Sequence, residues 1–284
     1  MFKYKKEIEQ KNDAGLSKTR REQYGQIAKR EFSLVADCGL LNMLFSLVLY
    51  AAFIGEYMLL TRLQAPTYAD RFRILFYGGI LATAGFALRA VGRAGNYGVL
   101  VKRAFNEGCL VGAQFMRSIR ENGGTAALFG MLTGISHMVM TCGSLHFLYN
   151  SDSAISKGLG VGICIFQFML VFAASEYTYC EQQVYVLPKS GYFRNGFLFS
   201  LMGFLPTLCW FALDILVPFV LCLLPLPVPV FVLLIWGTLL NAFLQVAACL
   251  FMLDRFDRYI NSENYPDRVG RGLAKEENNQ ETVE

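Results

Sequence analysis

The sequence predicts an all-α polytopic membrane protein with about six transmembrane helices and one cytoplasmic amphipathic helix at the membrane interface. Composition is the first ground, because 54% of the residues are hydrophobic, 17% are charged and the mean hydropathy is +0.38. The second ground is that the apolar residues form runs of about 20 or more, the length that crosses a hydrocarbon core. The third is that the charges gather at the chain ends and in short segments between these runs.

The strongest pair of runs lies near the C-terminus, at residues 196–223 and 230–253. The first run contains one acid, Asp214, and no base, and the second contains no ionisable group except the thiol of Cys249. Neither run has the polar stripe of a soluble amphipathic helix. The proline-rich segment Leu224–Pro229 separates them, and proline ends helices. The two runs are therefore expected to form a transmembrane helical hairpin.

Earlier in the chain the sequence predicts four more spans, at residues 34–60, 74–91, 125–149 and 158–179. Arg89 ends the second span and is expected to reach the membrane interface with its long side chain. Gly130 and Gly134 lie one turn apart in the third span, where small residues allow helices to approach closely. The predicted organisation is a cytoplasmic N-terminal segment, a transmembrane domain and a cytoplasmic tail, at residues 1–33, 34–253 and 254–284.

Residues 97–120 have a different pattern, with apolar or small residues at alternating spacings of four and three. This spacing draws one stripe along a helix. The stripe includes Val101, Phe105, Phe115 and Ile119, and charged or amide side chains lie off it. We expect an amphipathic helix on the cytoplasmic face, and the alternative is that this stripe contacts a partner protein.

The distribution of basic residues predicts the orientation. With six spans and the N-terminus inside, 22 of the 26 Lys and Arg residues fall on the inner side. This bias favours a multi-pass protein of the cell membrane with both termini cytoplasmic. The net charge of +4 is explained by residues that flank apolar spans, so the bilayer is the expected partner and nucleic acid is not.

Ionisable residues inside spans are candidate functional groups, because burying them is costly. In the predicted topology Glu56, His146 and Asp214 all lie in the outer half of the membrane, where they could line a polar pocket open to the outside. The alternative is that such groups lie at interfaces or make hydrogen bonds between helices. The same two alternatives apply to Asn241 and Gln245 in the last span, which with other amides could line a solute path or stabilise the bundle.

Sequence signatures of enzymes are absent. No GxSxG, HExxH or Walker-type pattern occurs, and no two of the eight cysteines lie within four residues of each other. We therefore predict no catalytic residues, no metal site and no cofactor. The cysteines are expected to be reduced packing residues.

Five short stretches stand out along the chain: Leu41–Ser46, Ala82–Gly85, Arg103–Phe105, Tyr192–Gly196 and Phe256–Ile260. In these stretches and their order the sequence resembles the YesL-like family of bacterial polytopic membrane proteins of unknown function. The resemblance covers roughly residues 31–261, but the family's usual proline after the first span and its Gly-Pro-Ala-Thr run are missing. It implies an accessory role beside sugar-uptake systems and identifies no catalytic residue.

Three functions follow from these observations. The first is a non-enzymatic accessory or regulatory component of a membrane transport system, the resemblance implying carbohydrate uptake, with a transporter or signalling membrane protein as partner. The second is a small-solute transporter that uses intramembrane acidic residues, although the chain has no internal repeat of the kind many transporters show. The third is a membrane-embedded enzyme acting on a lipid, for which no nucleophile–base pair is visible.

Overall fold

The chain is an all-α, multi-pass membrane protein. The computed structural model describes residues 3–4, 16–217, 220 and 228–274. Within these residues, five helices are long and apolar enough to cross a membrane, and a sixth candidate is a pair of helices bent by 98°. The elements are β1 (Lys3–Tyr4), α1 (Arg20–Arg30), α2 (Phe32–Arg62), α3 (Tyr68–Ala104), α4 (Val111–Asn150), α5 (Ala154–Val184), β2 (Tyr185–Val186), α6 (Lys189–Met202), α7 (Phe204–Phe211), η1 (Ala212–Leu216), α9 (Val228–Ile235), η2 (Trp236–Leu240), α10 (Asn241–Phe256), η3 (Asp257–Asn261), α11 (Ser262–Asn264) and η4 (Pro266–Arg268).

The outer surface of the helices is apolar, as a bilayer requires. Large hydrophobic side chains are exposed along them, including Leu44 (62%), Tyr77 (68%), Ile155 (75%) and Phe231 (65%). A soluble protein rarely exposes so much contiguous apolar surface. Lipid is the environment in which this surface is favourable.

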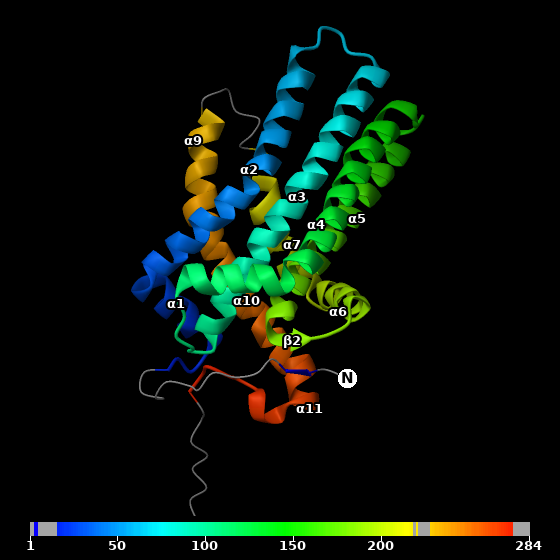
Figure 1. The fold of residues 1–284 in the computed structure, drawn as a ribbon. Coiled ribbons are helices and arrows are strands. Elements are labelled where there is room, and N and C mark those ends of the chain that lie inside the picture. Colours follow the sequence, from blue (N-terminus) through cyan, green and yellow to red (C-terminus); the bar gives the residue numbers. More distant parts are fainter. Residues whose placement is uncertain (1–2, 5–15, 218–219, 221–227, 275–284) are drawn as a thin grey trace, which may run out of the picture.

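Helices α3 and α4 form the longest antiparallel pair, with α2 and α5 packed beside them (Figure 1). Glycines bring the two backbones together. A Cβ atom on Gly130 would lie 2.6 Å from both Ala90 Cβ and Phe86 O, and one on Gly134 would overlap Thr83. The close approach predicted for these two glycines is confirmed.

The prediction of one amphipathic helix over residues 97–120 is wrong. Its first part is the end of α3, its last part is the start of α4, and a turn separates them. Asn106 adopts a positive φ of 56°. The Glu107 backbone amide donates to Lys102 O, and the Asn106 amide donates to Arg103 O. These two bonds form a Schellman motif, in which an asparagine in left-handed conformation ends the helix.

The fifth predicted span, residues 196–223, is also not one straight helix. It breaks at Gly203, and α6 and the segment Phe204–Asp214 meet at 98°. Pro206 explains the break, because proline has no amide hydrogen and its ring collides with the carbonyl four residues earlier, here that of Met202. By contrast the last span runs as one helical segment over Phe231–Asn264. Of the turn predicted before it, residues 224–227 lie outside the described part.

Helix α1 and the described residues that follow α10 fold onto the lower end of the bundle in Figure 1, beside the turn between α3 and α4. Gln23 on α1 donates to Ala104 O at 2.7 Å, and Arg20 pairs with Asp257 at 3.1 Å. From the other end of the chain, Arg271 pairs with Glu107 at 2.8 Å, both side chains being 6% exposed. Residues 17–30 and 254–274 therefore contact the helical bundle. β1 and β2 form a two-residue antiparallel ladder.

Candidate functional site: a buried ion cluster

One face of α3 carries two arginines and a tyrosine in the interior of the bundle. Arg89, Arg93 and Tyr97 are spaced four residues apart, so they lie one above another on the same side of the helix. Their exposed fractions are 4%, 2% and 1%. Arg89 therefore does not reach the membrane interface as predicted. A countercharge inside the protein is the reason.

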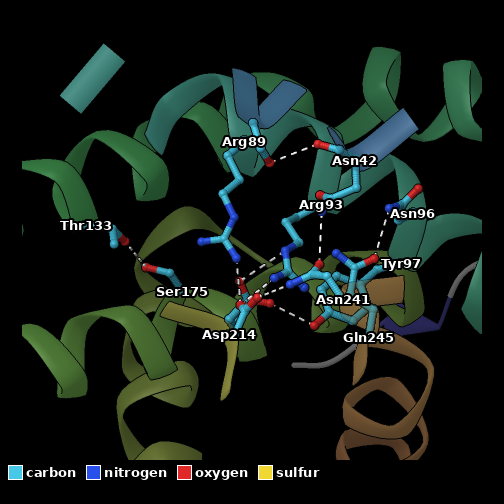
Figure 2. Close-up of polar contacts among 12 residues, drawn as sticks. Asn42, Arg89, Arg93, Asn96, Tyr97, Thr133, Ser175, Asp214, Asn241 and Gln245 are labelled. Carbon is cyan, nitrogen blue, oxygen red and sulfur yellow. Dashed lines mark hydrogen bonds and ion pairs between the residues drawn. The ribbon is translucent and has the colours of Figure 1, made fainter. Parts of the chain in front are cut away.

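That countercharge is Asp214 in η1, which accepts from three donors (Figure 2). Arg89 Nη2 donates to Asp214 Oδ2 at 2.6 Å, and Arg93 Nη2 bonds to the same oxygen. Asn241 Nδ2 donates to the other oxygen, Oδ1. Both guanidinium groups are thus held by one carboxylate, which satisfies the requirement that buried charges be paired and hydrogen-bonded.

Glu176 on α5 completes the cluster on the other side of Arg93. Its Oε1 lies 3.7 Å from Arg93 Nε, and its Oε2 accepts from the Tyr97 hydroxyl at 2.8 Å. The side chain of Glu176 is 16% exposed. Two cations and two acids therefore share one interior site.

Amide side chains surround the cluster and connect it to α2 and α10. Asn42 donates to Asn241 Oδ1 at 3.0 Å, and Asn96 donates to Gln245 Oε1 at 2.9 Å. If the Gln245 amide is rotated so that its oxygen and nitrogen exchange places, the oxygen instead accepts from Arg93 Nη1 at 2.6 Å and Nε at 2.9 Å. Two roles were considered for Asn241 and Gln245, and the structure shows the second, hydrogen bonds between helices. These bonds also fix the position of the ion cluster.

The cluster lies in the C-terminal half of α3. Arg73 near the opposite end of α3 is 20 residues from Arg93, which corresponds to about 30 Å of helix, the thickness of a bilayer core. Asp214 lies at the level of Arg89 and Arg93, and its position in the outer half of the membrane stays a prediction. The segment that carries Asp214 begins at Phe204, after the break at Gly203.

A cavity opens beside the cluster, between α3, α5, α7, η1 and α10. Arg93, Glu176 and Asp214 form its charged side. The hydroxyl groups of Tyr177 and Thr207 also border it, and neither makes a hydrogen bond of normal geometry to another described residue. The remaining wall is apolar and aromatic and includes Phe172, Trp210, Leu244, Ala248, Phe251 and Met252. An apolar cavity with a few convergent polar groups is the usual form of a small-molecule site.

The three residues predicted to share a pocket do not meet. Asp214 belongs to the cluster, while His146 is exposed and contacts Asn150 on its own helix, with Nδ1 3.1 Å from Asn150 Nδ2. Glu56 is 7% exposed and lines a separate groove between α2 and α3. Its carboxylate packs against Gly78, and its Oε1 has no hydrogen-bond partner among the described residues.

The stripe predicted to contact a partner is part of the protein core. Val101, Phe105 and Phe115 are 2%, 6% and 1% exposed, and Ile119 packs against the same core. The apolar pattern was real, but it faces the interior because residues 97–120 form a hairpin. Val101, Phe105 and Phe115 are not available to a partner in this structure, and Ile119 is partly buried.

Sequence reasoning missed the arginines of the site because it placed them at the membrane edge. The signal that could have found them is the spacing of Arg89, Arg93 and Tyr97 in a segment rich in Gly and Ala. A helix with small residues on its other faces is surrounded closely by neighbours, so its long polar side chains point into the bundle.

Comparisons with protein-family models, curated proteins and solved structures returned no match. Among the described residues, no three His, Cys, Asp or Glu side chains are grouped to hold a metal ion. The functional interpretation therefore rests on the cluster and its cavity.

Proposed function

We propose that this protein is a non-enzymatic carrier that binds a small polar solute in the cavity beside Arg93, Glu176 and Asp214 and moves it across the membrane. The observation that carries this proposal is the ion cluster itself. Interior charges are costly and typically mark substrate or ion pathways. Here they border a cavity whose other walls are apolar and aromatic, the usual form of a small-molecule site.

The broken helices support a carrier. Many transporters bind solutes where helices are interrupted near the membrane interior, and π-helical turns occur frequently at functional sites. Asp214 lies within the π-helical segment η1, downstream of the 98° break, and Asn241 directly follows the π-helical segment η2. Two interrupted helices thus supply Asp214 and the amide that holds it.

The accessory role beside a transport system stays a prediction. The apolar stripe that supported it is buried, so the geometry favours the carrier. Membership of the YesL-like family stays a prediction in the same way. We also propose that the protein lies in the cell membrane with both termini in the cytoplasm, which the distribution of Lys and Arg supports.

The test is solute flux in liposomes containing the purified full-length protein. Three labelled probes differ in charge: tetramethylammonium, acetate and glycerol. We expect protein-dependent, saturable flux of at least one probe, lowered by Asp214→Asn and unchanged by Glu56→Gln, because Glu56 lines a separate groove. Flux no greater than in empty liposomes for all three probes, from protein shown to be folded, would contradict the proposal.

A further inference from the structure

We propose that the solute is a small organic cation, an amine or quaternary ammonium, with Glu176 as its counter-ion and the aromatic wall of the cavity around it. This inference rests on the proposed carrier function and specifies its substrate class. Some charged groups at the cavity are already paired within the protein and others are not. The substrate class follows from this difference.

The two arginines are occupied. Both donate to Asp214, and Gln245 is placed to accept from two further nitrogens of Arg93. Only 3% of the Arg93 side chain is exposed. A solute anion would have to displace the carboxylate of Asp214 from two guanidinium groups, and breaking such a buried pair is strongly unfavourable.

Asp214 is occupied as well. Each of its oxygens has a donor, Asn241 on Oδ1 and the two arginines on Oδ2. A cation that bound to Asp214 would meet two positive charges at the same oxygen. Asp214 therefore orders the arginines and is a positioning residue for the site.

Glu176 is different, because one of its oxygens has no close donor. Oε2 accepts from Tyr97, whereas the distance of 3.7 Å between Oε1 and Arg93 Nε exceeds the length of a hydrogen bond. The side chain is the most exposed acid of the cluster, at 16% against 10% for Asp214. A carboxylate oxygen facing a cavity with spare acceptor capacity attracts an ammonium group.

The wall of the cavity suits the rest of such a cation. Five aromatic side chains border it: Tyr97, Phe172, Tyr177, Trp210 and Phe251. The faces of aromatic rings attract ammonium groups, and aromatic cages around quaternary nitrogen are a recurring use of this interaction. The side chains of Tyr177 and Thr207 add hydroxyl groups to the border of the cavity.

The charge balance allows a monocation to bind in exchange for a proton on Glu176. Arg89 and Arg93 on α3 are offset by Asp214 on η1 and Glu176 on α5, and α10 contributes the uncharged Gln245 to this cavity. A bound monocation changes the total by one unit, as does a proton on Glu176. The solute and a proton can therefore replace one another at Glu176 with the same total charge.

The experiment measures binding through the fluorescence of Trp210, which borders the cavity. The chain contains two tryptophans, so Trp236→Phe leaves Trp210 as the reporter in the full-length protein in detergent. Tetramethylammonium chloride, sodium acetate and glycerol are titrated. We expect a saturable response to tetramethylammonium alone, with Kd raised at least tenfold by Glu176→Gln.

Two further variants keep the result interpretable. Glu181→Gln makes the same change on the same helix, at a buried acid that accepts from Asn195 and does not border the cavity, and Kd should stay within twofold. Ala248→Phe fills the cavity without changing a charge and should abolish the response. It tests the proposal even where Glu176→Gln does not fold.

Each contrary outcome has a separate meaning. Saturable binding of acetate or glycerol in place of tetramethylammonium overturns the cation and leaves the carrier proposal standing. Tetramethylammonium binding that is unchanged in Glu176→Gln overturns the role of this residue. No response to any probe, together with no flux in liposomes, overturns the carrier proposal as well.

Discussion

Replacing Asp214 with Asn should be among the most destabilising isosteric changes in this protein. The substitution keeps shape and removes the charge that holds Arg89 and Arg93, which are 4% and 2% exposed. Arg93 retains Glu176 as an ionic neighbour at 3.7 Å, whereas Asp214 is the only carboxylate paired with Arg89 among the described residues. Leaving one buried charge without its partner costs about 3–5 kcal/mol. We expect a loss of that size in the free energy of unfolding.

The assay is equilibrium unfolding in mixed micelles with an increasing fraction of denaturing detergent. Asp254→Asn is the matched control, because Asp254 pairs with Arg258 on the exposed surface, where the side chains are 39% and 64% exposed. Breaking that pair should cost about 0.3–0.5 kcal/mol. Adding Arg89→Met to Asp214→Asn should recover about half of the loss, because it removes the unpaired charge. Equal, small losses for Asp214→Asn and Asp254→Asn would refute the reasoning.

Three further predictions concern packing, the chain ends and orientation. Gly130→Ala should destabilise the protein by about 1–3 kcal/mol, because the new methyl meets α3 atoms at 2.6 Å. In contrast, Gly124→Ala, with nothing within 4 Å of the added methyl, should be neutral or stabilising in the same unfolding assay. Glu107→Gln should speed amide hydrogen exchange at residues 105–110, because it weakens the ion pair with Arg271. Unchanged exchange would contradict the idea that this ion pair stabilises the turn between α3 and α4. A C-terminal reporter that is active only in the cytoplasm should be active, whereas activity of a periplasm-specific reporter would reverse the orientation.

The class of fold could be predicted from the sequence, because long apolar runs leave a chain few alternatives in a membrane. The first, third and fourth spans were found as α2, α4 and α5 with their ends displaced. The boundaries failed where local hydropathy misled. Helix α3 continues past Arg89 to Ala104, although two arginines make that segment look like a membrane edge.

The site could be predicted only in part, because its contacts join distant parts of the chain. Asp214 was identified from its cost of burial, but its partners Arg89 and Arg93 precede it by 125 and 121 residues. No local pattern encodes that pairing. The grouping of Glu56 with Asp214 failed for a related reason, since it assumed a straight fifth span, whereas that helix breaks at Gly203.

The most direct test of the carrier proposal is tetramethylammonium flux in liposomes, compared between the wild type and Ala248→Phe. This variant fills the cavity and leaves every member of the ion cluster in place. The account predicts saturable flux by the wild type and its loss in a variant that unfolds at a similar temperature. Flux unchanged by Ala248→Phe would contradict it, as would an inactive wild type that co-purifies with a stoichiometric membrane partner.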